Sequence, residues 1–157
     1  MRRIGGGGSD QGVVFAMDWN AKANRIVAGG RFSVQFFDTT GAVGSKDLIR
    51  PQGAKLMFVD WHPQKDLLAM GSFESTIHLW SDGFKREVTL GENTSMVGCV
   101  KWSPDGERFA SIDYSETVKL WDTEGKPIAE FTGSRGTPRG IAWTRDGKRL
   151  AISRRGG

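Results

Sequence analysis

The chain has 157 residues, which fits one domain of ordinary size, and its net charge is +4 at pH 7. Its single cysteine excludes an internal disulfide, and no long apolar run points to a signal peptide or a transmembrane segment. An unpaired cysteine favours a reducing compartment, so we expect a cytoplasmic or nuclear protein without membrane insertion.

Residues 1–12 contain a run of glycines and no apolar segment. This composition predicts a flexible leader. The repeating part of the chain, residues 13–157, is predicted to form one domain.

From residue 13 onward, short apolar runs alternate with polar turns, and no stretch has a helical period. The turn at 103–107 is typical, because Pro104 presets φ and Gly106 accepts a positive φ. In chain order, this pattern predicts strands at 13–19, 25–30 and 34–38; at 55–61, 67–71, 76–82 and 85–90; at 96–102, 108–112, 117–122 and 127–132; and at 139–143 and 149–153.

Tryptophans recur along these strands with the period of a whole supersecondary unit. The first strands end in Trp19, Trp61, Trp102 and Trp143, spaced 42, 41 and 41 residues apart. The third strands carry Trp80 and Trp121, with Phe37 in the equivalent place of the first copy. Seven residues after each first-strand tryptophan comes an apolar residue of the second strand, except that Val27 follows after eight. The unit is therefore a real repeat.

The clearest copy, "VKWSPDGERFAS" followed by "ETVKLWD" within 100–122, resembles the Trp-Asp (WD) repeat, whose copies form the blades of β-propellers. The resemblance implies an all-β fold, a partial β-propeller of four-stranded antiparallel blades. It implies three blades plus the first half of a fourth, at about 13–50, 55–90, 96–132 and 139–153.

Family members commonly link a Gly-His, a Ser or Thr, an Asp and the Trp by hydrogen bonds, and this chain contains no Gly-His. The nearest approach to the set is Ser72, Glu74 and Trp80. We therefore expect the propeller shape without its usual internal lock, and lower stability. The places aligned with the histidine hold Asp10, Gln52, Asn93 and Ser134.

Three and a half blades are fewer than the four to eight of closed propellers. Three explanations stay open. The chain is a fragment of a longer protein, copies of it share blades by self-association, or a second chain completes the ring.

The sequence predicts no catalytic, cofactor or metal site, and hence no enzyme. His62 follows a first strand and His78 is expected to face outward, with no ligand at metal spacing near either. Asp18 and Asp60 stand at repeat positions and are predicted to be structural. Cys99, within an apolar strand, is predicted to be a buried thiol.

The family resemblance implies that the chain binds other proteins. The binding face is expected where the loops before the first strand and the loops between the second and third strands come together. A surface that combines aromatic residues, methionine and basic residues is typical of protein–protein interfaces. The alternative is that Phe73 and Tyr114 only cap their own blades. The predicted rim consists of Arg31, Lys55, Phe73, Met96, Tyr114 and Arg139.

The predicted function is a non-catalytic protein–protein interaction scaffold in a multi-subunit assembly, with trafficking or ciliary transport as its setting. A nucleic-acid-associated propeller is the rival, because residues 126–157 hold eight basic and two acidic residues. The same charges would also serve as solvated protection for strand edges.

Overall fold

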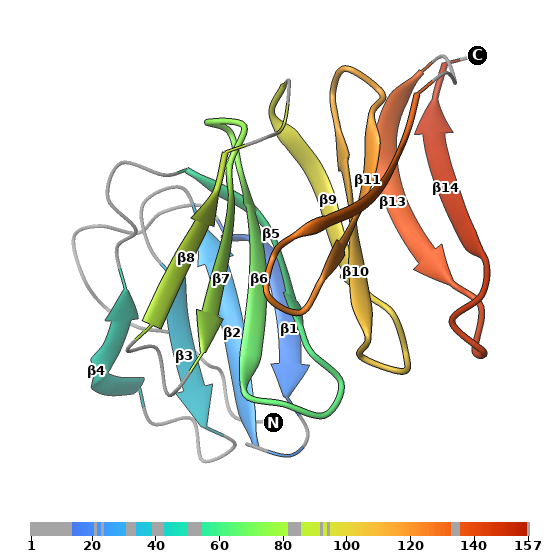
Figure 1. The fold of residues 1–157 in the computed structure, drawn as a ribbon. Helices are drawn as coiled ribbons and strands as arrows, with labels where there is room; N and C mark the ends of the chain where they lie inside the picture. Colours follow the sequence, from blue (N-terminus) through green and yellow to red (C-terminus); the bar gives the residue numbers. More distant parts are fainter. Residues whose placement is uncertain are drawn as a thin grey trace.

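The computed structural model describes residues 14–20, 22, 24–30, 34–38, 43–49, 55–81, 86–91, 93, 95–132 and 136–156. Within them the fold is all-β, with strands arranged as successive sheets along the chain (Figure 1). Three sheets have four antiparallel strands and the last has two, as the family resemblance implies, although the strand pattern of the sequence predicts no strand at 43–49. The sheets follow one another side by side and do not close into a ring in the described part of the chain. The predicted leader at 1–12 lies outside these residues.

Each complete sheet is a meander in which consecutive strands pair. Tight turns permit this order, because antiparallel neighbours need only a few connecting residues. Blade 1 has β1 (Val14–Asn20), β2 (Arg25–Gly30), β3 (Val34–Asp38) and β4 (Val43–Ile49); blade 2 has β5 (Leu56–Trp61), β6 (Leu67–Ser72), β7 (Ile77–Ser81) and β8 (Arg86–Leu90); blade 3 has β9 (Val97–Trp102), β10 (Arg108–Asp113), β11 (Val118–Asp122) and β12 (Pro127–Phe131); blade 4 has β13 (Thr137–Trp143) and β14 (Leu150–Arg155).

The strand register places the landmark residues opposite one another in rows. In blade 3, Trp102 pairs with Phe109, and Phe109 with Trp121. Blade 2 repeats this row through Leu68. In blade 1 the partner of Trp19 is Ile26, seven residues later, so the predicted match to Val27 is wrong and the phase is uniform.

The hydrophobic core lies between neighbouring blades, because each sheet presents apolar residues on both faces. The third-strand tryptophans Trp80 and Trp121 are almost fully buried. Trp80 packs in the interface of blades 1 and 2 with Val27 and Phe36. Trp121 packs between blades 2 and 3 with Ile77 and Leu79 of the preceding blade. The third interface, between blades 3 and 4, contains no third-strand tryptophan among the described residues.

The ends of the array leave apolar side chains in solvent. On β1, Met17 and Trp19 are 70% and 59% exposed, whereas the equivalent Val59 and Trp61 of the second blade are buried. At the other end, Phe131 of β12 is 56% exposed. Stacked blades bury these positions only where a neighbour is present.

Candidate functional site

The first strand of every blade bulges at the same repeat position. The register skips one residue in β1, β5, β9 and β13, and the skipped residues are Phe15, Met57, Gly98 and Arg139. A bulge adds a residue to one strand and re-aims its side chain. The bulges stand near the end of the blades at which the first strands begin. Met57 and Gly98 are site candidates that the sequence analysis missed, although the tryptophan period relates them to Arg139.

In blades 2 and 3, the loops between second and third strands lie at this same end (Figure 1). Each loop folds over the residue that precedes its blade. Phe73 N donates to Lys55 O at 2.9 Å, and Tyr114 N donates to Met96 O at 3.0 Å. The structure thus pairs Lys55 with Phe73 and Met96 with Tyr114 in equivalent positions of two blades.

Side chains within the two loops hold their shape. In blade 3, the Asp113 carboxylate accepts hydrogen bonds from the backbone N–H groups of Ser115 and Thr117 at 3.0 and 3.1 Å. In blade 2, the Ser72 hydroxyl stands in the same place and accepts from Thr76 N at 3.2 Å. Such side-chain bonds replace backbone pairs in tight turns, so the aromatic residues stand on ordered loops.

The ring of Tyr114 lies over the bulge of its own blade. A Cβ atom built on Gly98 would come within 3.1 Å of the Tyr114 ring and 3.0 Å of Pro138 Cγ in blade 4. The ring therefore occupies the room that the missing side chain leaves, and it remains 36% exposed. Tyr114 both caps its blade and presents an aromatic surface.

The other two predicted rim residues, Arg31 and Arg139, are not part of these pairs. Arg31 lies outside the described residues. Arg139 is exposed on the bulge of β13, two residues beyond Thr137, which is the position equivalent to Lys55 and Met96. The described rim is therefore made of Lys55, Phe73, Met96 and Tyr114, with Arg139 beside it in the next blade.

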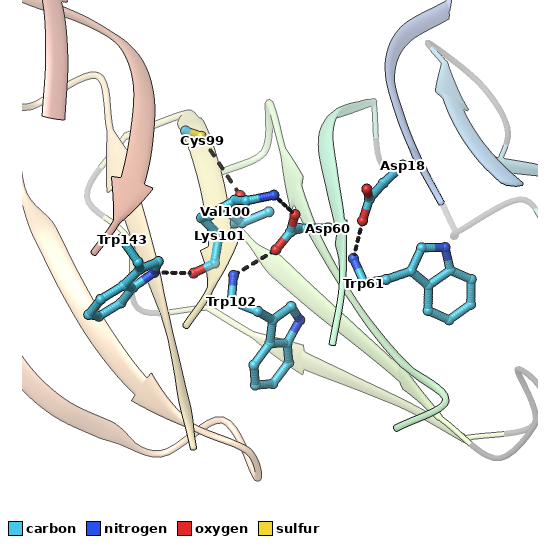
Figure 2. Close-up of polar contacts among 8 residues, drawn as sticks. All are labelled: Asp18, Asp60, Trp61, Cys99, Val100, Lys101, Trp102 and Trp143. Carbon is cyan, nitrogen blue, oxygen red and sulfur yellow. Dashed lines mark hydrogen bonds and ion pairs between the residues drawn. The ribbon is translucent and has the colours of Figure 1, made fainter. Parts of the chain in front are cut away.

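Aspartates on the first strands connect blade 1 to blade 2 and blade 2 to blade 3 (Figure 2). Asp18 accepts a hydrogen bond from Trp61 N, and Asp60 accepts one from Trp102 N, both at 2.6 Å. Lys101 stands in the equivalent place of blade 3 and reaches back to form an ion pair with Asp60. Burial raises the pKa of Asp60 to about 6, and Lys101 opposes that rise. Both carboxylates accept hydrogen bonds from backbone N–H groups of the next blade, in line with a structural role.

Blade 3 contains part of the hydrogen-bonded set that family members commonly build around the third-strand tryptophan. Trp121 Nε1 donates to Ser111 Oγ at 2.8 Å, so the nearest approach to the usual set is here, and the prediction of Ser72, Glu74 and Trp80 is wrong. Ser72 and Glu74 act in the rim loop instead, where the Glu74 carboxylate accepts from Lys55 N at 2.9 Å.

Both histidines are buried and serve the fold. His78 does not face outward as predicted, because its ring nitrogens lie 3.1 and 3.3 Å from the hydroxyls of Thr76 and Thr89. His62 Nδ1 accepts from the backbone N–H groups of Gln64 and Lys65, which leaves Nε2 to donate to the Gly106 carbonyl at 2.9 Å. Burial lowers the pKa of His62, and the Gly106 carbonyl opposes this change.

The described residues contain neither a metal-binding cluster nor a reactive cysteine. No group of three or more His, Cys, Asp or Glu side chains there could hold a metal ion. The Cys99 thiol is buried, and burial raises its pKa, which disfavours the reactive thiolate. The described residues form no helix that is long and apolar enough to cross a membrane.

Comparison with known proteins gives a family match. The model of the anaphase-promoting complex subunit 4 WD40 domain matches residues 59–137, about half of the chain. The match runs from β5 through blades 2 and 3 to the first residue of β13. No curated protein matches the chain.

Proposed function

Because this chain belongs to the family of WD40 β-propeller domains, we propose that it is a non-catalytic scaffold that binds other proteins through the rim of blades 2 and 3. WD40 domains generally act as protein-binding scaffolds. The observation that carries the proposal is the repeated placement of Phe73 and Tyr114 on ordered loops, each tied by one backbone hydrogen bond to Lys55 or Met96.

The composition of the rim supports protein binding. Tyr and Met are enriched in interfaces, and a rigid aromatic ring loses little conformational entropy when a partner covers it. Tyr114 is held against Gly98 and still exposes a third of its surface. A partner would bury this ring without having to order it first.

The setting that we propose is a multi-subunit assembly in the cytoplasm. The matching family model is named for a subunit of a large complex, the anaphase-promoting complex. Trafficking and ciliary-transport assemblies are further settings of the same kind. The single cysteine, Cys99, is unpaired, which favours a reducing compartment.

The test compares the proteins that the purified chain captures before and after the rim is changed. We expect Phe73→Ala with Tyr114→Ala to reduce captured partners about tenfold, since aromatic hot spots dominate interfaces. Lys126→Ala, in an exposed turn at the opposite end of blade 3, is the control and should leave capture unchanged. Equal capture by the double variant and the wild type would remove the rim as the binding surface.

Nucleic-acid binding through the basic third is the competing function. Arg139, Arg145 and Arg149 are all exposed on the blade 4 hairpin. If this function holds, binding to RNA or DNA weakens steeply with salt and is lost when these three charges are reversed.

A further inference from the structure

The residue after each first-strand tryptophan begins the turn that leads to the second strand. In blades 1, 3 and 4 it is Asn20, Ser103 or Thr144, whose side chains hydrogen-bond to backbone groups of the same hairpin. None of these three side chains gains or loses a proton near neutral pH. Blade 2 carries His62 at this position, and a histidine does titrate in that range.

The buried His62 ring holds two turns together. Its Nδ1 accepts hydrogen bonds from the backbone N–H groups of Gln64 and Lys65, both at 3.0 Å, and so fixes the turn of blade 2. Its Nε2 donates to the carbonyl of Gly106 at 2.9 Å and so ties that turn to the corresponding turn of blade 3. Both ring nitrogens are engaged, and the arrangement requires the neutral ring with its one hydrogen on Nε2.

The ring also fills the space between the two turns. Its centroid lies 4.8 Å from that of the Trp102 ring, and a Cβ atom built on Gly106 would lie 2.4 Å from its Cε1. A ring packed this closely on both sides cannot turn away in place. His62 can therefore exchange its hydrogen-bond partners only if the turns of blades 2 and 3 move apart.

A second proton on His62 conflicts with these contacts. Nδ1 would then carry a hydrogen, so it could no longer accept from Gln64 and Lys65, and three N–H donors would point at one another. Buried donors without an acceptor are strongly destabilising. Burial disfavours the charged ring as well, which is the main cause of its lowered pKa.

The charged groups around the histidine ring do not compensate for a positive charge. Lys65 of its own turn and Lys22 of the blade 1 turn disfavour the charged ring, and Glu107 of the blade 3 turn favours it. Asp105, in the same turn as Glu107, accepts from Glu107 N at 3.0 Å and lies against Gly147 of blade 4 instead. In the described part of the chain, the hydrogen-bond partners of the ring are backbone groups, so no carboxylate holds the charged ring in place.

We propose that the turn at residues 62–66 is an acid-sensitive joint between blades 2 and 3. When His62 takes up a second proton, Gln64 and Lys65 lose their acceptor, the ring leaves its place beside Gly106, and the two turns separate. At neutral pH the joint is closed. The joint lies at the end of the blades opposite the rim, so it acts whether or not the rim binds a partner.

The rest of the interface keeps blades 2 and 3 together when the joint opens. Asp60 accepts from Trp102 N at 2.6 Å, and Trp121 packs with Ile77 and Leu79 of the preceding blade. Neither contact involves the histidine ring. Opening is therefore local, and blade 3 with its rim loop remains folded.

Hydrogen exchange followed by NMR on the intact 157-residue chain tests the joint. We expect exchange at the amides of Gln64 and Lys65, corrected for the intrinsic effect of pH, to speed up by up to about tenfold for each pH unit below 6.5, because opening takes up one proton. The increase should level off at the pKa of the folded His62 ring, which the NMR signals of the ring report directly. The amides of Phe73 and Tyr114 in the rim loops should keep constant protection.

Three variants separate the joint from other titrating groups. His62→Ser places at this position the residue type that blade 3 has at Ser103, and it should remove the pH dependence at Lys65. His78→Gln changes the other histidine, and Asp60→Asn removes the carboxylate that titrates in the same interface. Both of these controls should leave the pH dependence as it is in the wild type.

Exchange at Gln64 and Lys65 that shows no pH dependence after correction, or the same dependence in His62→Ser as in the wild type, would overturn the joint. An equal rise in exchange at Phe73 and Tyr114 would do so too, because it would mean that the whole chain, rather than one turn, opens in acid. Should His62→Ser fail to fold, the wild-type comparison of turn amides with rim amides still decides the matter.

Discussion

The carboxylate of Asp60 in one blade holds the backbone of Trp102 in the next, with Oδ2 2.6 Å from the tryptophan nitrogen. Asp18 holds Trp61 in the same way one blade earlier. The residues before Trp19 and Trp61 therefore each bond to the next blade, while the rings of Trp61 and Trp102 pack in the cores between blades. Lys101 ends the series, because a lysine cannot accept a hydrogen bond and instead pairs with Asp60.

Replacing Asp60 with alanine should destabilise the chain by about 2 kcal/mol, because the buried N–H of Trp102 would lose its acceptor. Urea denaturation followed by tryptophan fluorescence measures the change. Glu124→Ala is the control, since its ion pair with Lys126 is exposed on both sides and should contribute little. Equal effects of the two substitutions would contradict the structural role of Asp60.

The ionisation of Asp60 should make stability depend on pH between about 4 and 6. Its pKa is about 6 in the folded chain and 3.8 as a free side chain, so the folded state binds the extra proton in this range. The contribution of Asp60 to the free energy of unfolding therefore falls as pH rises through the range. Relative to Asp60→Asn, the wild type should lose stability from pH 4 to pH 6, and a difference that grows in the opposite direction would be inconsistent with this pKa.

His62 should act with the opposite sign. Its folded pKa lies below the ordinary 6.5, so its stabilising contribution is complete above pH 6.5 and is lost as pH falls toward the folded value. In an Asp60→Asn background, lowering the pH from 7.5 to 5 should reduce the free energy of unfolding, measured by urea denaturation. His62→Gln should remove this loss, and an unchanged pH profile in that variant would assign the effect to another group.

Gly106 should tolerate no side chain. Its φ of +75° favours glycine, and a Cβ atom there would overlap the ring of His62. We expect Gly106→Ala to lower the free energy of unfolding by at least ~1 kcal/mol through backbone strain and displacement of His62. Gly91→Ala is the control, because a Cβ atom there would meet nothing within 4 Å. A thermal midpoint that falls equally in both variants would show that the turn does not depend on this fit.

The blade could be predicted from the sequence because its signals are local. Alternating apolar residues mark the strands, turn residues separate them, and Trp102 and Trp121 keep their phase from copy to copy. Register follows from this pattern, since a slip of one residue would turn every apolar side chain to the wrong face. The same alignment predicts Lys55, Phe73, Met96 and Tyr114 as rim residues, whereas the hydrogen bonds that pair Lys55 with Phe73 and Met96 with Tyr114 come from the structure.

The contacts between blades required the tertiary structure. His62 of blade 2 bonds to the carbonyl of Gly106 in blade 3, 44 residues away, and within blade 2 the ring of His78 bonds to Thr89 of the neighbouring strand. A sequence pattern shows which residue types recur, but not which atom of one blade faces which atom of the next.

The sequence by itself thus determined the repeating blade and all of its strands except the one at 43–49, because short-range alternation and turn chemistry specify them. Only the tertiary structure decided what joins the blades and what shapes the rim: the link from Asp60 to Trp102, the contact of His62 with Gly106, and the bulge at Gly98 that seats Tyr114. The physical reason is that hydrogen bonds and packing across an interface depend on how two separately folded sheets stack, which no single repeat encodes.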